Sequence, residues 1–468
     1  MSNAQLQPVL DRIDADFDNS LERLFALLRI KSISADPAFA GDCKAAADYL
    51  AKDIATLGLT AEVRPTAGHP AVVARMNGAG AGGRPHVLFY GHYDVQPVDP
   101  LNLWHRPPFE PVVTDHADGR KIIVARGAED DKGQLMTFVE ACRAWKQVTG
   151  SLPVDVTILI EGEEEVGSKN FVPFLEKNKD DLKADFALVC DTGMWDQNTP
   201  AITTSLRGLV YDEVKIKAAS RDLHSGLFGG GAQNPIRVLT RILGGLFDEG
   251  GRITIPGFYD GVKDLPPEIL AQWKNLNLTP DSFLKPIGLS LPAGEKDRLL
   301  IEQVSSRPTC DINGIVGGYT GEGSKTVIPA EASAKVSFRL VEGQKPEKIR
   351  KAFRDYVTSR LPGDCKAEFT DHSNAPAIAL DWNMKPLAAA KRALTDEWGK
   401  EALLIGSGAS IPIVADFKNT LGLDTVLVGF GLDDDNIHSP NEKYDLKSFH
   451  KGIRSWARIL GAFAEAGK

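Results

Sequence analysis

The segment with the clearest capacity for chemistry is the acidic turn Gly-Ala-Glu-Asp-Asp-Lys-Gly at residues 127–133. It stands between a β-rich run at 121–125 and a helical pattern at 132–149. The sequence therefore predicts a strand-to-helix turn that projects acids beyond a sheet edge, where open α/β sheets bind ligands. Aspartate pairs in glycine-bounded turns more often cap helices or face solvent, so other residues must decide between these readings.

Further acid and imidazole groups follow other predicted strands. His92 and Asp94 follow the apolar strand 87–90, and residues two apart in an extended chain share a face, so Asp94 is expected to orient His92. Taken alone, such a pair is more often a capped turn or a core histidine. The glutamates at 161 and 163–165 follow a strand at 154–160, where their mutual repulsion needs a cation to offset it. Asp191 ends the next strand, and His438 follows the last one.

This set of groups indicates metal chemistry. Its members are His92, Asp130, Glu164, Glu165, Asp191 and His438. Histidines with several carboxylates suit zinc, cobalt or manganese, and the set is too large for one tetrahedral ion. Two ions about 3.5 to 4 Å apart, bridged by one carboxylate and a water, would use all the ligands. Such a water becomes a nucleophile near neutral pH, and a glutamate that is not a ligand can take its proton.

Composition limits the alternatives. A chain of 468 residues predicts two domains, and a net charge of -9 without a basic cluster argues against nucleic-acid binding. The five cysteines are scattered and form no C-x-x-C, which supports neither a disulfide framework nor a thiolate zinc site. No apolar run reaches the roughly 18 residues of a membrane span, so we expect a cytoplasmic protein without membrane contact.

The element pattern predicts an α/β catalytic domain with a mostly parallel sheet and helices on both faces, interrupted by an α+β domain. A single long helix is predicted at 6–28, and the glycine-rich segment between strands 71–76 and 86–90 is interpreted as a hairpin loop. The alternation changes near residue 207 and resumes near 381. The expected domains are 1–206 and 381–468 for the catalytic part and 207–380 for the insertion.

The segments that carry these residues resemble the metallo-aminoacylase and dipeptidase family of co-catalytic zinc peptidases, closest to its carnosinase-like cytosolic dipeptidase branch. The matching segments occur in family order along nearly the whole chain, at 91–95, 126–133, 161–168, 190–191, 224–226 and 438–442.

The resemblance implies a role for each candidate in the metal set. Asp130 would bridge two divalent ions, expected to be zinc, with manganese or cobalt as alternatives. The remaining roles by resemblance are His92 and Asp191 as ligands of one ion, Glu165 and His438 as ligands of the other, Glu164 as general base and Asp94 as support for His92. The resemblance also implies a cis peptide between Asp130 and Asp131.

The same resemblance makes the inserted domain a lid that forms a homodimer. His224 would reach the partner subunit's site and stabilise the oxyanion, and Thr326 would also act in trans. Arg339 would bind the substrate carboxylate bidentately, and Ser410 would line the pocket. One departure is Asn-Met-Lys at 383–385, where close relatives place a further pocket histidine. This departure argues against a preference for imidazole-bearing dipeptides.

The predicted function is a di-metal peptidase that hydrolyses dipeptides or short peptides at the amide next to a free carboxylate. An N-acyl-amino-acid amidohydrolase of the deacylase type is the main alternative, because its chemistry is the same. A phosphomonoesterase would need arginine and lysine clamps, for which Lys132 and Lys169 are weak support. A metal-stabilised binding protein would not need both Glu164 and Asp94.

Overall fold

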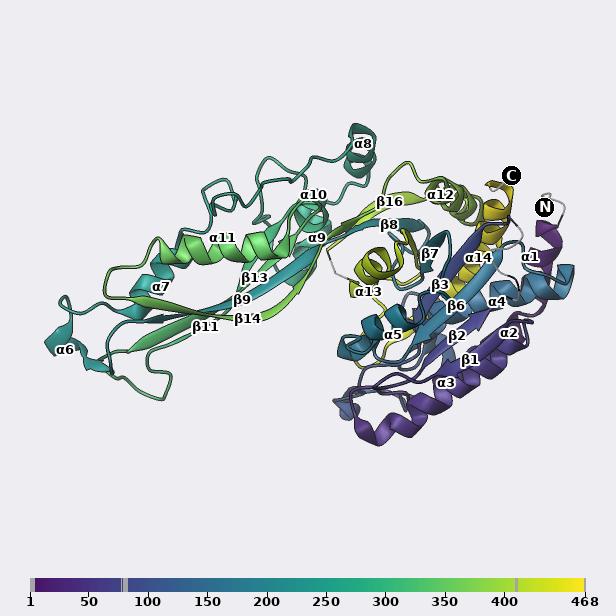
Figure 1. Cartoon of the computed structure of the whole chain (residues 1–468), viewed down its shortest axis with the longest axis horizontal. Helices are drawn as coiled ribbons and strands as arrows, with labels where there is room; N and C mark the ends of the chain where they lie inside the picture. Colours follow the sequence, from purple (N-terminus) through teal and green to yellow (C-terminus); the bar gives the residue numbers. More distant parts are fainter. Residues whose placement is uncertain (1–4, 77, 79–82, 409–410, 467–468) are drawn as a thin grey trace. The chain divides into compact units, whose positions relative to one another are not determined.

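The computed structural model describes residues 5–76, 78, 83–408 and 411–466. Its internal contacts divide the chain into two compact units. The first comprises Met1–Thr204, Leu380–Leu404 and Asp416–Lys468, and the second comprises Ser205–Ala379 and Ile405–Ala415. Figure 1 labels the elements of each. Within the described residues, no helix combines the length and hydropathy that a membrane span requires.

A large mixed sheet forms the first unit. Its strands run in the order β1 (Thr60–Arg64), β2 (Ala71–Arg75), β6 (Asp155–Glu161), β3 (His86–His92), β7 (Phe186–Val189), β17 (Thr425–Val428) and β8 (Ala201–Leu206), followed by β15 (Ile378–Ala379). The central strands β6, β3, β7 and β17 are parallel, and the strands on either side are antiparallel. The α/β class predicted from the sequence is confirmed.

The predicted hairpin between the strands at 71–76 and 86–90 is wrong. β6 pairs with β2 on one side and with β3 on the other, so it separates the two strands. A strand that is distant in sequence has inserted between neighbours, which local turn composition does not reveal.

Helices cover both faces of this sheet. Phe89 of β3 stacks on Phe138 of α4 (Lys132–Thr149) with ring centroids 3.8 Å apart, and its edge meets Trp456 of α14 (Leu446–Ala466) at 5.8 Å. The next residue, Tyr90, instead contacts Phe171 of α5 (Phe171–Lys177) and Phe417 of the π-helical turn Phe417–Leu421. Because successive strand residues point to opposite faces, α4 and α14 lie on one face and α5 on the other.

The long helix predicted at 6–28 is two helices, α1 (Leu6–Ala15) and α2 (Phe17–Leu28), separated at Asp16. The break follows their packing, since α1 contacts α14 and α4, whereas α2 contacts α4 and α3 (Ala40–Ala55). The carboxylate of Asp16 accepts a hydrogen bond from Asn19 at 2.7 Å and pairs with Arg23 at 3.1 Å. A continuous helical pattern therefore contained a bend that its apolar spacing did not show.

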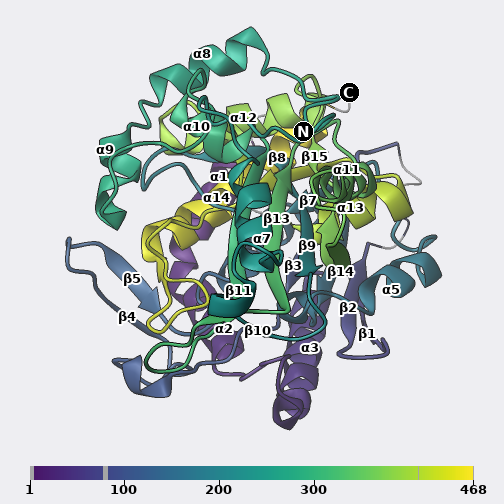
Figure 2. The same ribbon diagram turned by 90° about the vertical axis from the view of Figure 1, so that its left-hand side faces the viewer.

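A small antiparallel sheet orders β18 (Lys443–Asp445), β5 (Lys121–Val124) and β4 (Val112–Asp115) in the first unit. Figure 2 shows the β4–β5 hairpin with the late part of the chain, in yellow, beside it. Before β18 in the sequence come α12 (Lys385–Trp398), β16 (Leu403–Ser407), α13 (Pro412–Asp416) and then β17. The pairing of β18 with β5 brings the segment after β17 next to the turn at 127–131.

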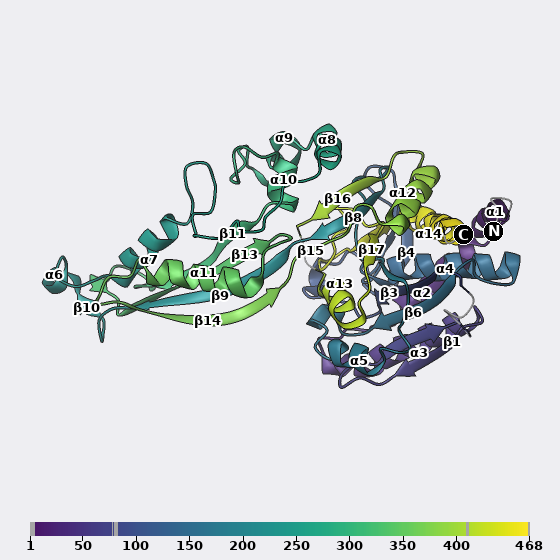
Figure 3. The ribbon, with the colours of Figure 1, turned by 45° about the horizontal axis from the view of Figure 1, so that its top comes forward.

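The second unit is built on an antiparallel sheet in the order β11 (Thr309–Gly317), β13 (Glu331–Leu340), β9 (Gly208–Lys217) and β14 (Lys366–Ala375). Its core combines alternate residues of β9 and β13 with the apolar sides of α7 (Pro235–Gly244) and α11 (Pro346–Thr358). Both helices therefore cover the same face, as Figure 3 also shows. The remaining short elements are β10 (Leu223–His224), α6 (Ser225–Phe228), α8 (Pro267–Asn275), α9 (Pro280–Phe283), α10 (Leu300–Ser305) and β12 (Val327–Ile328).

Candidate metal centre

The predicted metal residues meet at one edge of the first unit's sheet. The adjacent parallel strands β6, β3, β7 and β17 end at the same edge. His92 is the last residue of β3, Glu164 and Glu165 follow β6, and Asp191 follows β7. His438 lies in the loop after β17 and has a positive φ of 60°. Non-glycine residues rarely adopt this conformation, and they do so mainly at functional sites.

Asp130 is shared by two groups of ligand atoms. Atoms of His92, Asp130 and Asp191 all lie within 4.8 Å of one another, and so do atoms of Asp130, Glu165 and His438. One oxygen of Asp130, Oδ1, lies 3.1 Å from His92 Nε2, and the other, Oδ2, lies 3.0 Å from His438 Nε2. This arrangement offers two adjacent cation sites joined by one carboxylate.

The imidazole of His92 is oriented as a metal ligand requires. Its Nδ1 lies 3.1 Å from the carbonyl oxygen of Asp94, which only accepts, so the neutral ring carries its proton there. The buried Nε2 makes no hydrogen bond to any described residue, although Asp130 Oδ1 is near. An unpartnered lone pair among carboxylates fits a divalent cation, and the nitrogen and oxygen donors suit zinc, manganese or cobalt.

Burial and the neighbouring imidazoles set the pKa values of these acids. It raises the pKa of Asp191 well above its ordinary value. Burial, partly offset by His92, also raises the pKa of Glu164 to about 7. Burial acts in the same direction on Asp130, but the imidazoles of His438 and His92 outweigh it and lower the pKa of that carboxyl. The imidazoles therefore favour the ionised form of the shared carboxyl.

Asp94 supports the centre differently from the sequence expectation. Its carboxylate lies 3.4 Å from His92 Nδ1, farther than its own backbone oxygen. The two carboxylate oxygens instead accept hydrogen bonds from the backbone N–H groups of Glu164 at 3.2 Å and Glu165 at 3.1 Å. Asp94 therefore holds the turn that carries Glu164 and Glu165. The other two glutamates of this run have separate partners, since Ser168 donates to Glu161 and Asn170 donates to Glu163.

The two aspartates of the turn have separate partners. Asp131 lies outside both ligand groups, and its Oδ2 accepts a hydrogen bond from the backbone N–H of His92 at 3.0 Å. The Asp130–Asp131 peptide is cis, as the resemblance implies. Lys132 begins α4 and donates to the carbonyl oxygen of Ile30 at 2.7 Å. Asp131 therefore connects the turn to the end of β3, and Lys132 connects the start of α4 to the segment after α2.

Glu442 has no role in the set of expected ligands, although this residue closes one of the matching segments. Its fully buried carboxylate accepts hydrogen bonds from the backbone N–H groups of Gly127, Glu129 and Asp130 and from the guanidinium of Arg126. Backbone amides of a strand-to-helix turn are a common phosphate-binding site. Here an internal carboxylate occupies them, which weighs against the phosphomonoesterase alternative.

The predicted residues of the second unit fall into separate places. His224 of β10 pairs with Val327 of β12, and Thr326 immediately precedes that strand, where its carbonyl accepts the N–H of Ser225 at 3.0 Å. Both side chains are exposed. Nδ1 of His224 accepts a hydrogen bond from Gly226 N–H at 3.0 Å, which leaves the proton of the neutral ring on Nε2. Ser410 lies outside the described residues.

Arg339 has a cationic neighbour that the sequence analysis did not single out. Arg339 lies in β13, and Arg207 immediately precedes β9, with which β13 pairs. Burial, together with the charge of Arg339, lowers the pKa of Arg207 to about 10. One nitrogen of Arg207, Nη1, is buried without a hydrogen bond to any described residue. This pair of guanidiniums is therefore suited to bind an anion.

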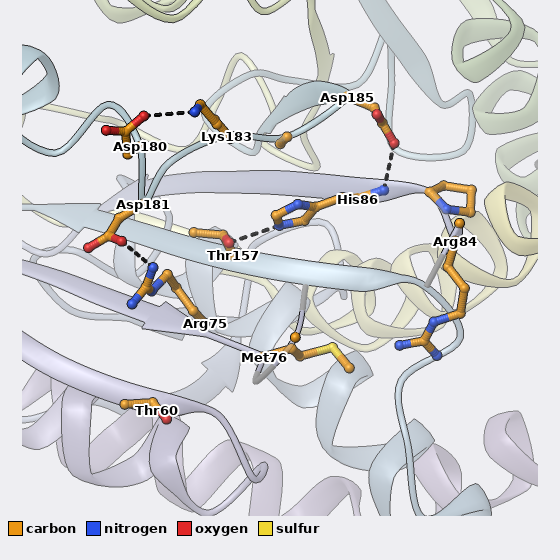
Figure 4. Close-up of a pocket in the computed structure, with 14 residues that line it drawn as sticks. Thr60, Arg75, Met76, Arg84, His86, Thr157, Asp180, Asp181, Lys183 and Asp185 are labelled. Carbon is orange, nitrogen blue, oxygen red and sulfur yellow. Dashed lines mark hydrogen bonds and ion pairs between the residues drawn. The ribbon is translucent and has the colours of Figure 1, made fainter. Parts of the chain in front are cut away.

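A further hollow lies at the opposite edge of the first unit's sheet, and its residues do not form a second candidate functional site. Figure 4 shows His86 at the start of β3 and Asp185 just before β7 among its lining residues. The charged groups there bind each other or their neighbours: Lys183 with Asp180 at 2.7 Å, Arg75 with Asp181, Arg84 with Asp155, and His86 with Thr157 and Asp185.

Comparisons with known proteins agree with this geometry. The model of Peptidase family M20/M25/M40 matches residues 88–462. The chain is 30% identical to the Cys-Gly metallodipeptidase of Schizosaccharomyces pombe, covering 98% of each chain. It is 32% identical to the human Beta-Ala-His dipeptidase, over 81% of this chain and 75% of that one. The solved M20 family metallo-carboxypeptidase of Sulfolobus solfataricus has a TM-score of 0.78 and 33% identity, covering 95% of this chain and 99% of that chain.

Removal of divalent ions should lower the thermal stability of this protein, and Asp130→Asn should abolish most of that effect. Ion binding at about 100 times the Kd stabilises a fold by about 2.7 kcal/mol, and both groups lose their shared ligand in the variant. Calorimetric unfolding with zinc and with a chelator measures the difference. Asp118→Asn, at an exposed acid of the same unit, should keep the wild-type response. An ion-dependent shift that survives in Asp130→Asn would show that Asp130 is not the shared ligand.

Proposed function

Because the chain belongs to Peptidase family M20/M25/M40, we propose that its Asp130 centre hydrolyses the amide next to the free carboxylate of a dipeptide or short peptide. The chain is a metal-dependent dipeptidase. The observation that carries the proposed site is the position of Asp130 in both ligand groups. Two divalent ions bound there would polarise the scissile carbonyl and acidify a water. We take zinc as the physiological ion, with manganese or cobalt as alternatives.

Glu164 is proposed as the general base. It lies outside both ligand groups, and its pKa of about 7 suits proton transfer at neutral pH. The hydrogen bond from its backbone N–H to Asp94 fixes the start of its turn. In this scheme Glu164 accepts the proton of the attacking water and delivers it to the leaving amine. Asp94 acts through the backbone that it holds.

The second unit is proposed to recognise the substrate. Arg339 would bind the free carboxylate, and Arg207 would add to the positive charge beside it. His224 would donate from Nε2 to the oxyanion, with Thr326 near it at the start of the paired strand. Ser410 would line the pocket. Specificity for a free carboxylate would then come from the arginines, and rate enhancement at the carbonyl would come partly from His224.

His224 and Thr326 are proposed to act in the partner subunit of a homodimer. Support comes from the exposed edge strand β11, where Val316 is 68% exposed, and from Leu227 next to His224, which is 78% exposed. Exposed apolar side chains of this kind, together with the free edge of a sheet, are suited to contact another chain. The five cysteines are all buried and free, which supports a reducing compartment, and we propose the cytoplasm.

A substrate screen tests the function. We expect hydrolysis of dipeptides and slow or no release from N-acetyl amino acids. Amidation of the dipeptide's C-terminus should reduce kcat/KM about 10- to 100-fold or more, because a buried charged hydrogen bond contributes about 1.5–3 kcal/mol. Longer peptides distinguish a carboxypeptidase, which releases single C-terminal residues from them. Fast deacylation with untouched dipeptides would assign the chain to the amidohydrolases instead.

Glu164→Gln should reduce kcat about 100- to 10,000-fold while both ions remain bound, because the change removes a base and no ligand. Steady-state kinetics and elemental analysis of the same preparation measure the two effects. Glu163→Gln is the matched control, since Glu163 is bound by Asn170 and lies outside both ligand groups. Loss of an ion from Glu164→Gln would mean that Glu164 is a ligand.

Mixed dimers test the action of His224 in trans. His224→Ala and Asp130→Ala homodimers should both be inactive, whereas a mixed dimer should recover about half the wild-type kcat from one intact site. Pairing His224→Ala with a subunit that carries both changes is the control and should recover nothing. A mixed dimer that assembles and stays inactive would contradict the arrangement.

A further inference from the structure

We propose that Glu442 is a positioning residue that holds Asp130 between both cation sites by filling a nest of backbone amides. The inference rests on the proposed ligand role of Asp130. Its basis is the set of contacts that one fully buried carboxylate makes with the turn at 127–130. None of these contacts is made with a ligand side chain, so Glu442 acts through the backbone.

Each oxygen of Glu442 accepts two donors. Oε1 accepts the backbone N–H of Glu129 at 3.0 Å and that of Asp130 at 3.1 Å. Oε2 accepts the N–H of Gly127 at 2.9 Å and Nη1 of Arg126 at 2.8 Å. Consecutive amides that converge on one anion form a rigid concavity. The position of the Asp130 main chain is therefore set by a residue on another segment of the chain.

That segment also supplies His438. The backbone N–H of Ala125 donates to the carbonyl of Glu442 at 3.2 Å, and the strand that follows, β18, pairs with β5. On the other side of His438, the N–H of Lys443 donates to the carbonyl of Asp435 at 2.9 Å, and their side chains form a buried ion pair at 2.5 Å. The loop is closed at its base, so Glu442 places Asp130 relative to His438.

Glutamine cannot replace Glu442 at this place. In Glu442→Gln one oxygen becomes an NH₂ group, which donates and does not accept. Whichever oxygen is replaced, the new group faces two N–H donors. The variant keeps the volume of the side chain but loses half of the acceptors, so the turn must shift or leave amides unpaired. The shift moves Asp130, which belongs to both ligand groups.

The affinities for both ions should therefore fall together in this variant. Mutation of residues that hold metal ligands through hydrogen bonds typically lowers metal affinity about 10- to 100-fold. We expect an effect of this size for Glu442→Gln. Gln96 provides the contrast, because its Nε2 donates to Oε2 of Glu165 at 2.6 Å, and Glu165 belongs to one group alone. Gln96→Leu should therefore lower the affinity for one ion and leave the affinity for the other near its wild-type value.

The test is a titration of the metal-free full-length protein with cobalt(II), followed by its visible absorption and by calorimetry, without any peptide. We expect Glu442→Gln to raise the Kd of both binding steps about 10- to 100-fold. The matched control is Glu140→Gln, a buried acid of α4 that binds Ser20, Arg23 and Arg143. It should lower the unfolding midpoint and leave both cobalt affinities unchanged. Saturating cobalt should restore part of the kcat of Glu442→Gln.

Wild-type affinity for both ions in Glu442→Gln, or an equal loss in Glu140→Gln, would overturn the inference. Loss of only one ion would also overturn it, because Asp130 is shared. Should Glu442→Gln fail to fold, Glu442→Asp takes its place, since a shorter carboxylate does not reach all the donors, and the same outcomes apply. If the proposed peptide hydrolysis were wrong, the substrate screen of the wild-type protein would show it. The cobalt titration uses no peptide, so its result does not depend on that screen.

Discussion

Buried negative charge at one edge of the first unit's sheet is the constraint on which the rest of the structure depends. Asp131 and Glu129 are buried there and Asp191 is half-buried, and removal from solvent raises the pKa of each. Carboxylates packed this closely destabilise a fold unless cations, guanidinium groups or amides compensate them. Arg126, the imidazoles and the turn's backbone amides compensate part of the negative charge. The oxygen and nitrogen atoms of the two ligand groups are suited to bind divalent cations, which would compensate the rest.

Carboxylates also connect the segments of the site to each other. Asp131 accepts from the backbone of His92, Asp94 accepts from the turn of Glu164 and Glu165, and Glu442 accepts from the turn of Asp130. Each connection joins a ligand-bearing segment to a different one. Because the acceptors contact main-chain N–H groups, they fix the backbone and leave the ligand side chains free to bind. This explains why so many acids gather where only some of them are ligands.

The two units contribute different chemistry. The residues for ions and proton transfer all belong to the first, whereas the arginines and His224 belong to the second. The chemistry of amide hydrolysis is shared between dipeptidases and deacylases, so with the proposed roles of Arg339 and His224 the second unit would determine which substrate is accepted. The relatives that cover most of this chain are dipeptidases, and one solved relative is a carboxypeptidase.

The sequence by itself determined the strongly periodic elements and the residue types of the site. Helix α4 occupies the predicted residues 132–149 because its apolar pattern is continuous and locally bounded. Acids and histidines after strands could be named as candidate ligands, since parallel strands end at one edge. The tertiary structure alone decided the insertion of β6 between β2 and β3, the break at Asp16 and the separate contacts of Asp130, Asp131 and Glu442. The physical reason is that a carboxylate has the same chemistry everywhere in a sequence. Whether it faces a cation or accepts amides depends on segments that lie hundreds of residues away along the chain, as Glu442 and Gly127 do.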